Sequence, residues 1–123
     1  MRSNDGNIDP KGRFWVSMMT DPLVTEPENE GVLFRLDPDG SLHRMLEPVQ
    51  IGNGIGWSKD NKTMFYNDSP TKTISRFDYD LETGTISNRR PFWKVPDSEP
   101  ECAVPDGFCQ VGVLGRLWRG VKG

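Results

Sequence analysis

The chain has 123 residues, a formal net charge of −3, 34% hydrophobic residues and 27% charged residues, which is typical of a small β-rich globular protein. Its basic residues are scattered and no apolar run approaches the roughly 20 residues that cross a bilayer, so neither nucleic acid nor a membrane is an expected partner. The N-terminus lacks the apolar core of a secretion signal, and we therefore expect a cytoplasmic location.

Short β-rich runs separated by turn signals follow one another along the chain, and no window shows a 3.6-residue apolar period. This pattern predicts an antiparallel all-β fold. The expected strands are 12–19, 31–36, 41–46, 55–57, 62–66, 73–79 and 85–90. The expected turns are 9–12, 37–40, 58–61 and 80–84. In the second of these turns, Pro38 presets φ and Gly40 accepts a positive φ.

One short phrase, in which Asn or Asp stands before Gly, occurs three times, and each copy precedes a strand-like run. The copies are Asn4-Asp5-Gly6, Gly52-Asn53-Gly54 and Pro105-Asp106-Gly107. Aligned on Asp5, Asn53 and Asp106, they lie 48 and 53 residues apart. Such periods indicate β-propeller blades, which take roughly 40–50 residues each. The chain therefore holds about two and a half blades, too few for a closed six-bladed ring.

The second expected blade begins at Asn53 and has four strands, the number typical of a propeller blade. A third blade is only started, because Gly115–Trp118 echoes Gly12–Trp15 and the chain then ends at Gly123. The segment 110–115 stands where the first blade has its Asp- and Pro-containing turn, and it contains neither residue.

The three phrases have two interpretations. Asn-Gly and Asp-Gly are common turn dipeptides, so their role could be structural. Alternatively, small oxygen-bearing side chains at the same place in successive blades would point at a common axis, and a hard cation such as Ca²⁺ needs several oxygen ligands. The pattern alone leaves both interpretations open, and the Gly-Arg-Phe-Trp and Gly-Arg-Leu-Trp runs downstream of the first and third copies add weight to the metal site.

Other motifs are better explained structurally. The glycine-rich stretch 52–56 lacks the spacing of a dinucleotide fingerprint. The segment 78–84 resembles a calcium loop, but Arg89 stands at the final ligand position, which favours a hairpin turn. Cys102 and Cys109 read as two free thiols, with a disulfide as the alternative in an oxidising compartment.

Several ordered motifs resemble the senescence marker protein/gluconolactonase family. The segment 2–15 looks like the opening of a central blade in that family, and later segments match in the same order. These are Gly52–Ser58, Asn67–Pro70, Phe77–Asp80 with 84–90, and Pro105–Cys109. The resemblance covers residues 2–110 of a single domain spanning 1–123, and the tail 111–123 diverges from it.

The resemblance implies a six-bladed propeller that holds one divalent metal on its axis and hydrolyses sugar lactones. By motif, Asn53 and Asp106 would be metal ligands, and Asp106 would also be the general base. Arg2 and Asn4 would contact the substrate, with Asn4 as a further ligand in the pattern of some relatives. The expected cation is Ca²⁺, with Zn²⁺, Mn²⁺ or Mg²⁺ as alternatives. Such a cation polarises a lactone carbonyl, while a carboxylate beside it accepts a proton from water.

The acidic segment 20–30 corresponds to a loop that carries a substrate-contacting Glu in the family. Glu26, Glu28 and Glu30 are the candidates for that residue. The resemblance also places a metal-binding Glu on an earlier blade that has no counterpart here. With the divergent tail, this pattern predicts a truncated, mis-spliced or frame-altered product.

The sequence therefore supports two hypotheses. The first is a partial, metal-dependent hydrolase of sugar lactones whose activity falls because the ring is incomplete. The alternative is a non-catalytic calcium-binding or vestigial propeller fragment.

Overall fold

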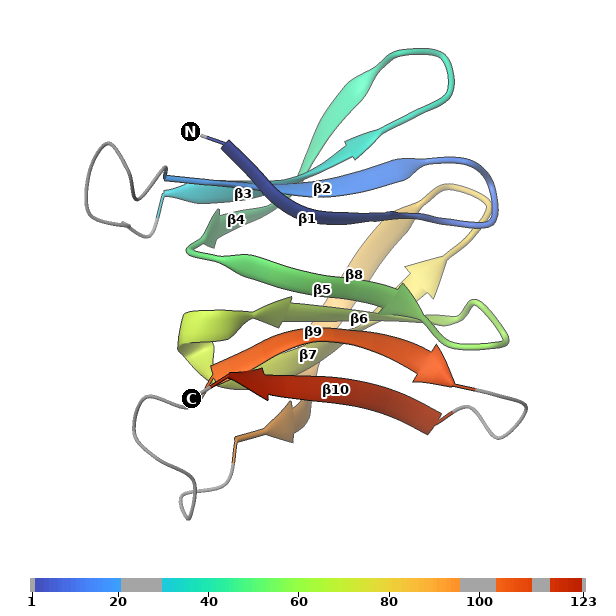
Figure 1. The fold of residues 1–123 in the computed structure, drawn as a ribbon. Helices are drawn as coiled ribbons and strands as arrows, with labels where there is room; N and C mark the ends of the chain where they lie inside the picture. The colour runs from blue at the N-terminus through green and yellow to red at the C-terminus, as the bar shows by residue number, and fades with distance from the viewer. Residues whose placement is uncertain (1, 21–29, 96–103, 112–115, 123) are drawn as a thin grey trace.

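The computed structural model describes residues 2–20 and 30–95, together with the backbone of 104–111 and 116–122. These residues form three antiparallel sheets that follow one another along the chain (Figure 1). The first sheet has the order β1 (Arg2–Ile8), β2 (Phe14–Met19), β3 (Gly31–Leu36) and β4 (Leu42–Val49). The second has the order β5 (Gly52–Trp57), β6 (Thr63–Asp68), β7 (Thr73–Asp80) and β8 (Thr85–Lys94), with a short 3₁₀ turn η1 (Ser69–Thr71) after β6. The third pairs β9 (Val104–Val111) with β10 (Arg116–Lys122).

This architecture confirms the predicted all-β fold and its repeating four-stranded unit. The predicted turns are confirmed too, with Gly12, Gly40 and Gly84 at positive φ values of 80°, 88° and 70°. Because an L side chain strains in that region, glycine is the residue these turns require.

The structure corrects one expectation about the repeated phrases. They do not precede strands but lie inside β1, β5 and β9, the first strand of each sheet. The sequence misses β1, the first half of β5 and β9 as strands because Gly, Asn and Asp have low strand propensity. In the structure, pairing with the next strand overrides that local preference.

The hydrophobic core lies between the first and second sheets. Its centre is a trio of aromatic rings, Trp15, Trp57 and Tyr79, whose centroids lie 5.8–6.3 Å apart with tilted or edge-on planes. Such edge-on contacts between rings add to the stabilisation from burial alone. The other buried members of this core are Leu33, Val49, Ile55, Met64, Tyr66 and Phe77.

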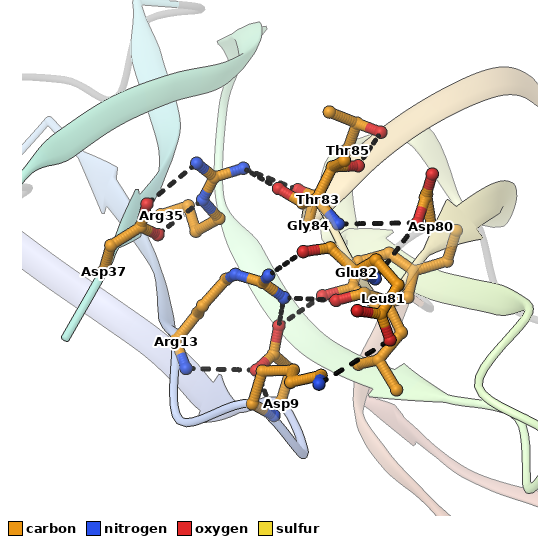
Figure 2. Close-up of polar contacts among 12 residues, drawn as sticks. Asp9, Arg13, Arg35, Asp37, Asp80, Leu81, Glu82, Thr83, Gly84 and Thr85 are labelled. Atoms are coloured by element: carbon orange, nitrogen blue, oxygen red, sulfur yellow. Dashed lines mark hydrogen bonds and ion pairs between the residues drawn. The ribbon is translucent and has the colours of Figure 1, made fainter.

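Arg13, in the β1–β2 connection, and Arg35, on β3, bind the second sheet to the first (Figure 2). Arg13 donates from its guanidinium to the carbonyl oxygens of Leu81 and Glu82, both at 2.8 Å. Arg35 donates to the carbonyl oxygens of Thr83 at 3.2 Å and Gly84 at 2.7 Å. Together they bind the backbone of the β7–β8 hairpin, which holds the two sheets at a fixed mutual orientation.

The first sheet also carries a row of apolar side chains on the face that points away from the second sheet. This face is more exposed to solvent than the face that packs against the second sheet. Ile8, Phe14, Leu36 and Leu42 pair directly across its four strands, and each is 38–61% exposed. The same register positions in the second sheet hold Trp57, Met64 and Phe77, which are at most 9% exposed against the first sheet. The exposed row therefore occupies the position that packs between sheets elsewhere in this chain.

Candidate functional site

The first strand of each sheet contains an irregularity at the same place. In β1 the register shifts between Ser3 and Gly6, and in β5 it shifts between Gly52 and Ile55. In β10 it shifts between Arg119 and Val121, opposite β9. Each shift sets two residues of the first strand against one residue of its partner, which is the arrangement of a β-bulge. Bulges re-aim side chains and are common next to active sites.

The registers identify the equivalent residues as Asn4, Asn53 and Asp106, each being the first of the two bulged residues. The sequence alignment on Asp5 is therefore wrong by one position. The Asp5 carboxylate instead accepts a hydrogen bond from the following Gly6 N–H at 2.8 Å. Asn4 is left to reach across to the next sheet.

The bulges of β1 and β5 meet through their side chains. Asn4 Nδ2 donates to the Gly52 carbonyl oxygen at 2.7 Å and to Asn53 Oδ1 at 3.0 Å. Further along the same two strands, Asn7 Nδ2 donates to the Ile55 carbonyl oxygen at 3.0 Å. The strands β1, β5 and β9 run in the same direction and are neighbours in the order β1, β5, β9 (Figure 1). The three equivalent positions thus lie towards the same end of the molecule.

Asn53 is hydrogen-bonded by residues at the end of β6 and at the start of η1. Its Nδ2 donates to Ser69 Oγ at 2.9 Å, and its backbone carbonyl accepts a hydrogen bond from Asn67 Nδ2 at 3.1 Å. Asp68 accepts hydrogen bonds from the backbone N–H groups of Gln50 and Ile51. The motif Asn67–Pro70, which carried no role in the sequence, supports Asn53 in the structure.

The remaining predicted site residues have different outcomes. Arg2 lies on β1, exposed, next to the Asn4 bulge. The backbone of Asp106 lies on β9, but its side chain is outside the described residues, as are Glu26 and Glu28. Glu30 accepts a hydrogen bond from Thr20 Oγ1 at 2.6 Å. The ligand and substrate roles of these residues stay predictions.

Close packing surrounds the Asn53 bulge. A Cβ placed on Gly52 would lie 2.1 Å from Ser17 Oγ and 2.6 Å from Tyr66 Oη. Ser17 and Tyr66 share a hydrogen bond at 2.9 Å, and burial raises the pKa of the Tyr66 hydroxyl, which therefore stays neutral. Only glycine fits at position 52, so the strand backbone there is closely confined by its neighbours.

Two further observations bear on ligand binding. Among the described residues, no cluster of three or more His, Cys, Asp or Glu side chains could hold a metal ion. A cavity of about 510 Å³ lies at the other end of β1 and β5, where Asn7, Ile8, Trp57 and Lys59 are among its lining residues. The cavity is thus separate from the Asn4–Asn53 contact.

No helix in the described part of the chain is long and apolar enough to cross a membrane. The expected cytoplasmic location and the expected absence of nucleic-acid and membrane partners stay predictions.

The fold and the site together define an incomplete β-propeller whose first strands bring polar side chains together at one end. A family model described as the SMP-30/gluconolactonase/LRE-like region matches residues 1–122. The chain belongs to this family, which confirms the resemblance drawn from its motifs. The match extends into 111–123, and the boundary expected at residue 110 stays a prediction.

The curated relatives of this chain include regucalcins from several animals. Regucalcin from Gallus gallus is 43% identical over 120 residues, and regucalcin from Homo sapiens is 42% identical over the same length. Each alignment covers 95% of this chain but 38% of the relative, so the chain spans about two fifths of the curated relatives it matches.

Solved structures also align with nearly all of this chain but with only part of their own length. A luciferin-regenerating enzyme aligns with a TM-score of 0.84 at 35% identity, covering 98% of this chain and 39% of the enzyme. A gluconolactonase from Xanthomonas campestris aligns with a TM-score of 0.73 at 31% identity, covering 97% of this chain and 42% of that protein. The prediction of an incomplete propeller is confirmed.

Proposed function

We propose that this chain forms the inner strands of a divalent-cation site in a lactone-hydrolysing propeller. The observation that carries the proposal is the meeting of the β1 and β5 bulges, where Asn4 donates to Asn53 Oδ1 at 3.0 Å. Membership of a family that includes a gluconolactonase supports the reaction class. Because the chain spans 38% of its curated relatives, lactone hydrolysis by the whole protein is part of the proposal.

The donor chemistry at the bulges fits a hard cation. A carbonyl oxygen has two lone pairs, so the hydrogen bond from Asn4 leaves the second lone pair of Asn53 Oδ1 for a metal ion. Asp106 occupies the equivalent register position on β9, and an aspartate carries a carboxylate. Amide carbonyl and carboxylate oxygens are the ligands that Ca²⁺ prefers. Asn53 and Asp106 would therefore hold the ion, with Zn²⁺, Mn²⁺ and Mg²⁺ as alternatives to Ca²⁺.

The other residues take roles set by their positions. Both Nδ2 hydrogens of Asn4 are engaged, one by the Gly52 carbonyl and one by Asn53, so Asn4 offers its own Oδ1 to a substrate hydroxyl. Arg2 lies on the same strand and contacts the substrate from the exposed side. A bound cation supplies electrostatic stabilisation of negative charge on the lactone oxygen. Asp106 accepts the proton of the attacking water.

The test measures hydrolysis of a sugar lactone by this chain with and without added Ca²⁺, Zn²⁺, Mn²⁺ or Mg²⁺. We expect metal-dependent turnover that Asp106→Ala lowers by at least about 100-fold, because general-base catalysis alone contributes about 10²–10⁴. Asn53→Ala should lower the turnover by removing a ligand of the cation. Asp39→Ala is the matched control, since Asp39 is exposed in the β3–β4 turn. A turnover rate that changes neither with added metal nor with Asp106→Ala would contradict the proposal.

A second candidate function is cation binding without catalysis. It is favoured by the short span of the chain relative to its relatives, because residues on further blades would be needed to enclose a substrate. Calorimetric Ca²⁺ binding that Asn53→Ala abolishes, with no lactone turnover under any metal, would select this candidate.

A further inference from the structure

The orientation of the Asn53 side-chain amide follows from a short chain of hydrogen bonds. The Gly52 carbonyl oxygen can only accept, so the Asn4 atom 2.7 Å from it must be the amide nitrogen. That same nitrogen lies 3.0 Å from the Asn53 side chain, and the Asn53 atom facing it must therefore be the oxygen. The Asn53 nitrogen is left on the other side, where it donates to Ser69 Oγ at 2.9 Å.

Ser69 is rigidly placed for this contact. It is 3% exposed, and its backbone N–H donates to the Ile51 carbonyl oxygen at 2.9 Å. The neighbouring Asp68 carboxylate accepts from the N–H groups of Gln50 and Ile51 at 3.0 and 2.8 Å. These bonds tie η1 to the segment that leads into β5, so the Ser69 hydroxyl and the Asn53 bulge keep a fixed separation.

We propose that Ser69 is a positioning residue that holds the Asn53 amide with its oxygen towards the bulge of β1 and its nitrogen away from the cation site. The inference rests on the proposed function, because it assigns Ser69 to the same cation site. An asparagine amide has one end that ligates a cation and one end that repels it. A partner that binds the nitrogen end therefore raises the fraction of Asn53 side chains that are ready to ligate, as outer-shell partners do for other metal ligands.

The first experiment needs neither metal nor a variant. Nuclear magnetic resonance of the metal-free chain should show Overhauser contacts from the Asn53 side-chain amide protons to the Ser69 β protons. The same amide protons should exchange slowly with solvent, and Ser69→Ala should accelerate that exchange. Amide protons of Asn53 that instead face Asn4, or exchange that Ser69→Ala leaves unchanged, would overturn the assignment.

The second experiment titrates Ca²⁺ by calorimetry into the unmodified chain, Ser69→Ala, Asn53→Asp, the double variant and one control variant. Ser69→Ala should weaken Ca²⁺ binding about tenfold, the lower end of the range for outer-shell partners of metal ligands. In the Asn53→Asp background the same Ser69→Ala change should cost much less, because a carboxylate presents an oxygen in either orientation. Ser87→Ala is the matched control, since Ser87 is exposed on β8.

The outcomes separate the inference from the proposed function. Equal losses of affinity in the two backgrounds would mean that Ser69 acts through the fold alone, and the positioning role would be wrong. If the unmodified chain binds no Ca²⁺, the proposed cation site fails in this chain, while the resonance experiment still decides the amide orientation. Nuclear magnetic resonance spectra with the same chemical-shift dispersion as the unmodified chain establish that each variant is folded.

Discussion

Asp9 is the most heavily engaged carboxylate among the described residues. It is 3% exposed, and it accepts hydrogen bonds from the Arg13 guanidinium, the Tyr79 hydroxyl and the backbone N–H groups of Lys11 and Arg13. Burial by itself raises the pKa of Asp9, but the hydrogen bonds from Tyr79 and Arg13 outweigh it and hold the pKa below the ordinary value of 3.8. The ionised form is therefore part of the folded structure.

The sign of the pH dependence follows from that direction. Because the folded state lowers the Asp9 pKa, the stabilisation is complete above the ordinary pKa and is lost as the pH falls through the folded value. We expect the free energy of unfolding, measured by urea denaturation, to be level above about pH 5 and to fall progressively as the pH drops below that value. Asp9→Asn should flatten part of this fall and cost about 3–5 kcal/mol at neutral pH, because Arg13 then loses its buried partner. A pH profile identical to that of the unmodified chain would contradict this account.

Gly52 tests how tightly the site is packed. Gly52→Ala places a methyl group 2.1 Å from Ser17 Oγ, and we expect it to cost about 1–3 kcal/mol or more from overpacking. Gly40→Ala is the comparison, because nothing lies within 4 Å of its added Cβ and only its φ of 88° opposes the change. That strain alone is about 1–2 kcal/mol. Thermal melts of both variants check the order, and a smaller loss for Gly52→Ala would contradict the packing.

At the scale of elements, the β7–β8 hairpin is joined to the first sheet by charged donors. Arg35 pairs with Asp37 at 2.7 and 3.0 Å and also donates to the hairpin carbonyls of Thr83 and Gly84. It is 7% exposed, so water does not replace these bonds readily. The guanidinium suits the position because its donors form a planar fork with a fixed geometry.

Replacing Arg35 should therefore loosen the two sheets from each other. We expect Arg35→Leu to lower the free energy of unfolding by about 1.5–3 kcal/mol, the range for hydrogen bonds to charged groups. Arg44→Leu is the matched control, since Arg44 and its partner Glu47 have side chains 64% and 54% exposed and should contribute about 1 kcal/mol or less. Urea denaturation of both variants measures the difference, and equal losses would argue against the inter-sheet role.

At the scale of the whole molecule, the two faces of the first sheet differ sharply in exposure. The face towards the second sheet buries Trp15 and Leu33 completely. The far face carries the row of Ile8, Phe14, Leu36 and Leu42, in the register positions that the second sheet buries. Apolar side chains gain stabilisation only when another surface covers them, so the same register position has a different energetic role in each sheet.

Phe77 and Leu36 occupy equivalent register positions and test this difference. Phe77 is 3% exposed and Leu36 is 38% exposed. Phe77→Ala should cost about 3–5 kcal/mol through the lost contacts and the cavity it leaves. Leu36→Ala should cost roughly 1 kcal/mol or less, because more than a third of its surface is already exposed to water. Calorimetric melts compare the two, and a large loss for Leu36→Ala would show that something covers the row in solution.

Much of the fold could be predicted from the sequence because its signals are local. Turn chemistry at Pro38 and Gly40, the short β-rich runs and the blade-sized interval depend only on neighbouring residues and their spacing. The motifs around Asn53 and Asp106 also gave the family. The strand β1 was missed because its Gly, Asn and Asp residues argue against a strand locally, and only pairing with β2 overrides them.

The sequence by itself determined the all-β class, the repeat and the polar residues that recur in it. Only the tertiary structure decided which residues are equivalent, because a bulge shifts the register by one residue and the shift is visible only in strand pairing. It also decided that Asn4 meets Asn53 across 49 residues of chain and that Ser69 holds Asn53 from behind. The physical reason is that a side chain's hydrogen-bond partners are set by packing between strands that lie far apart in sequence.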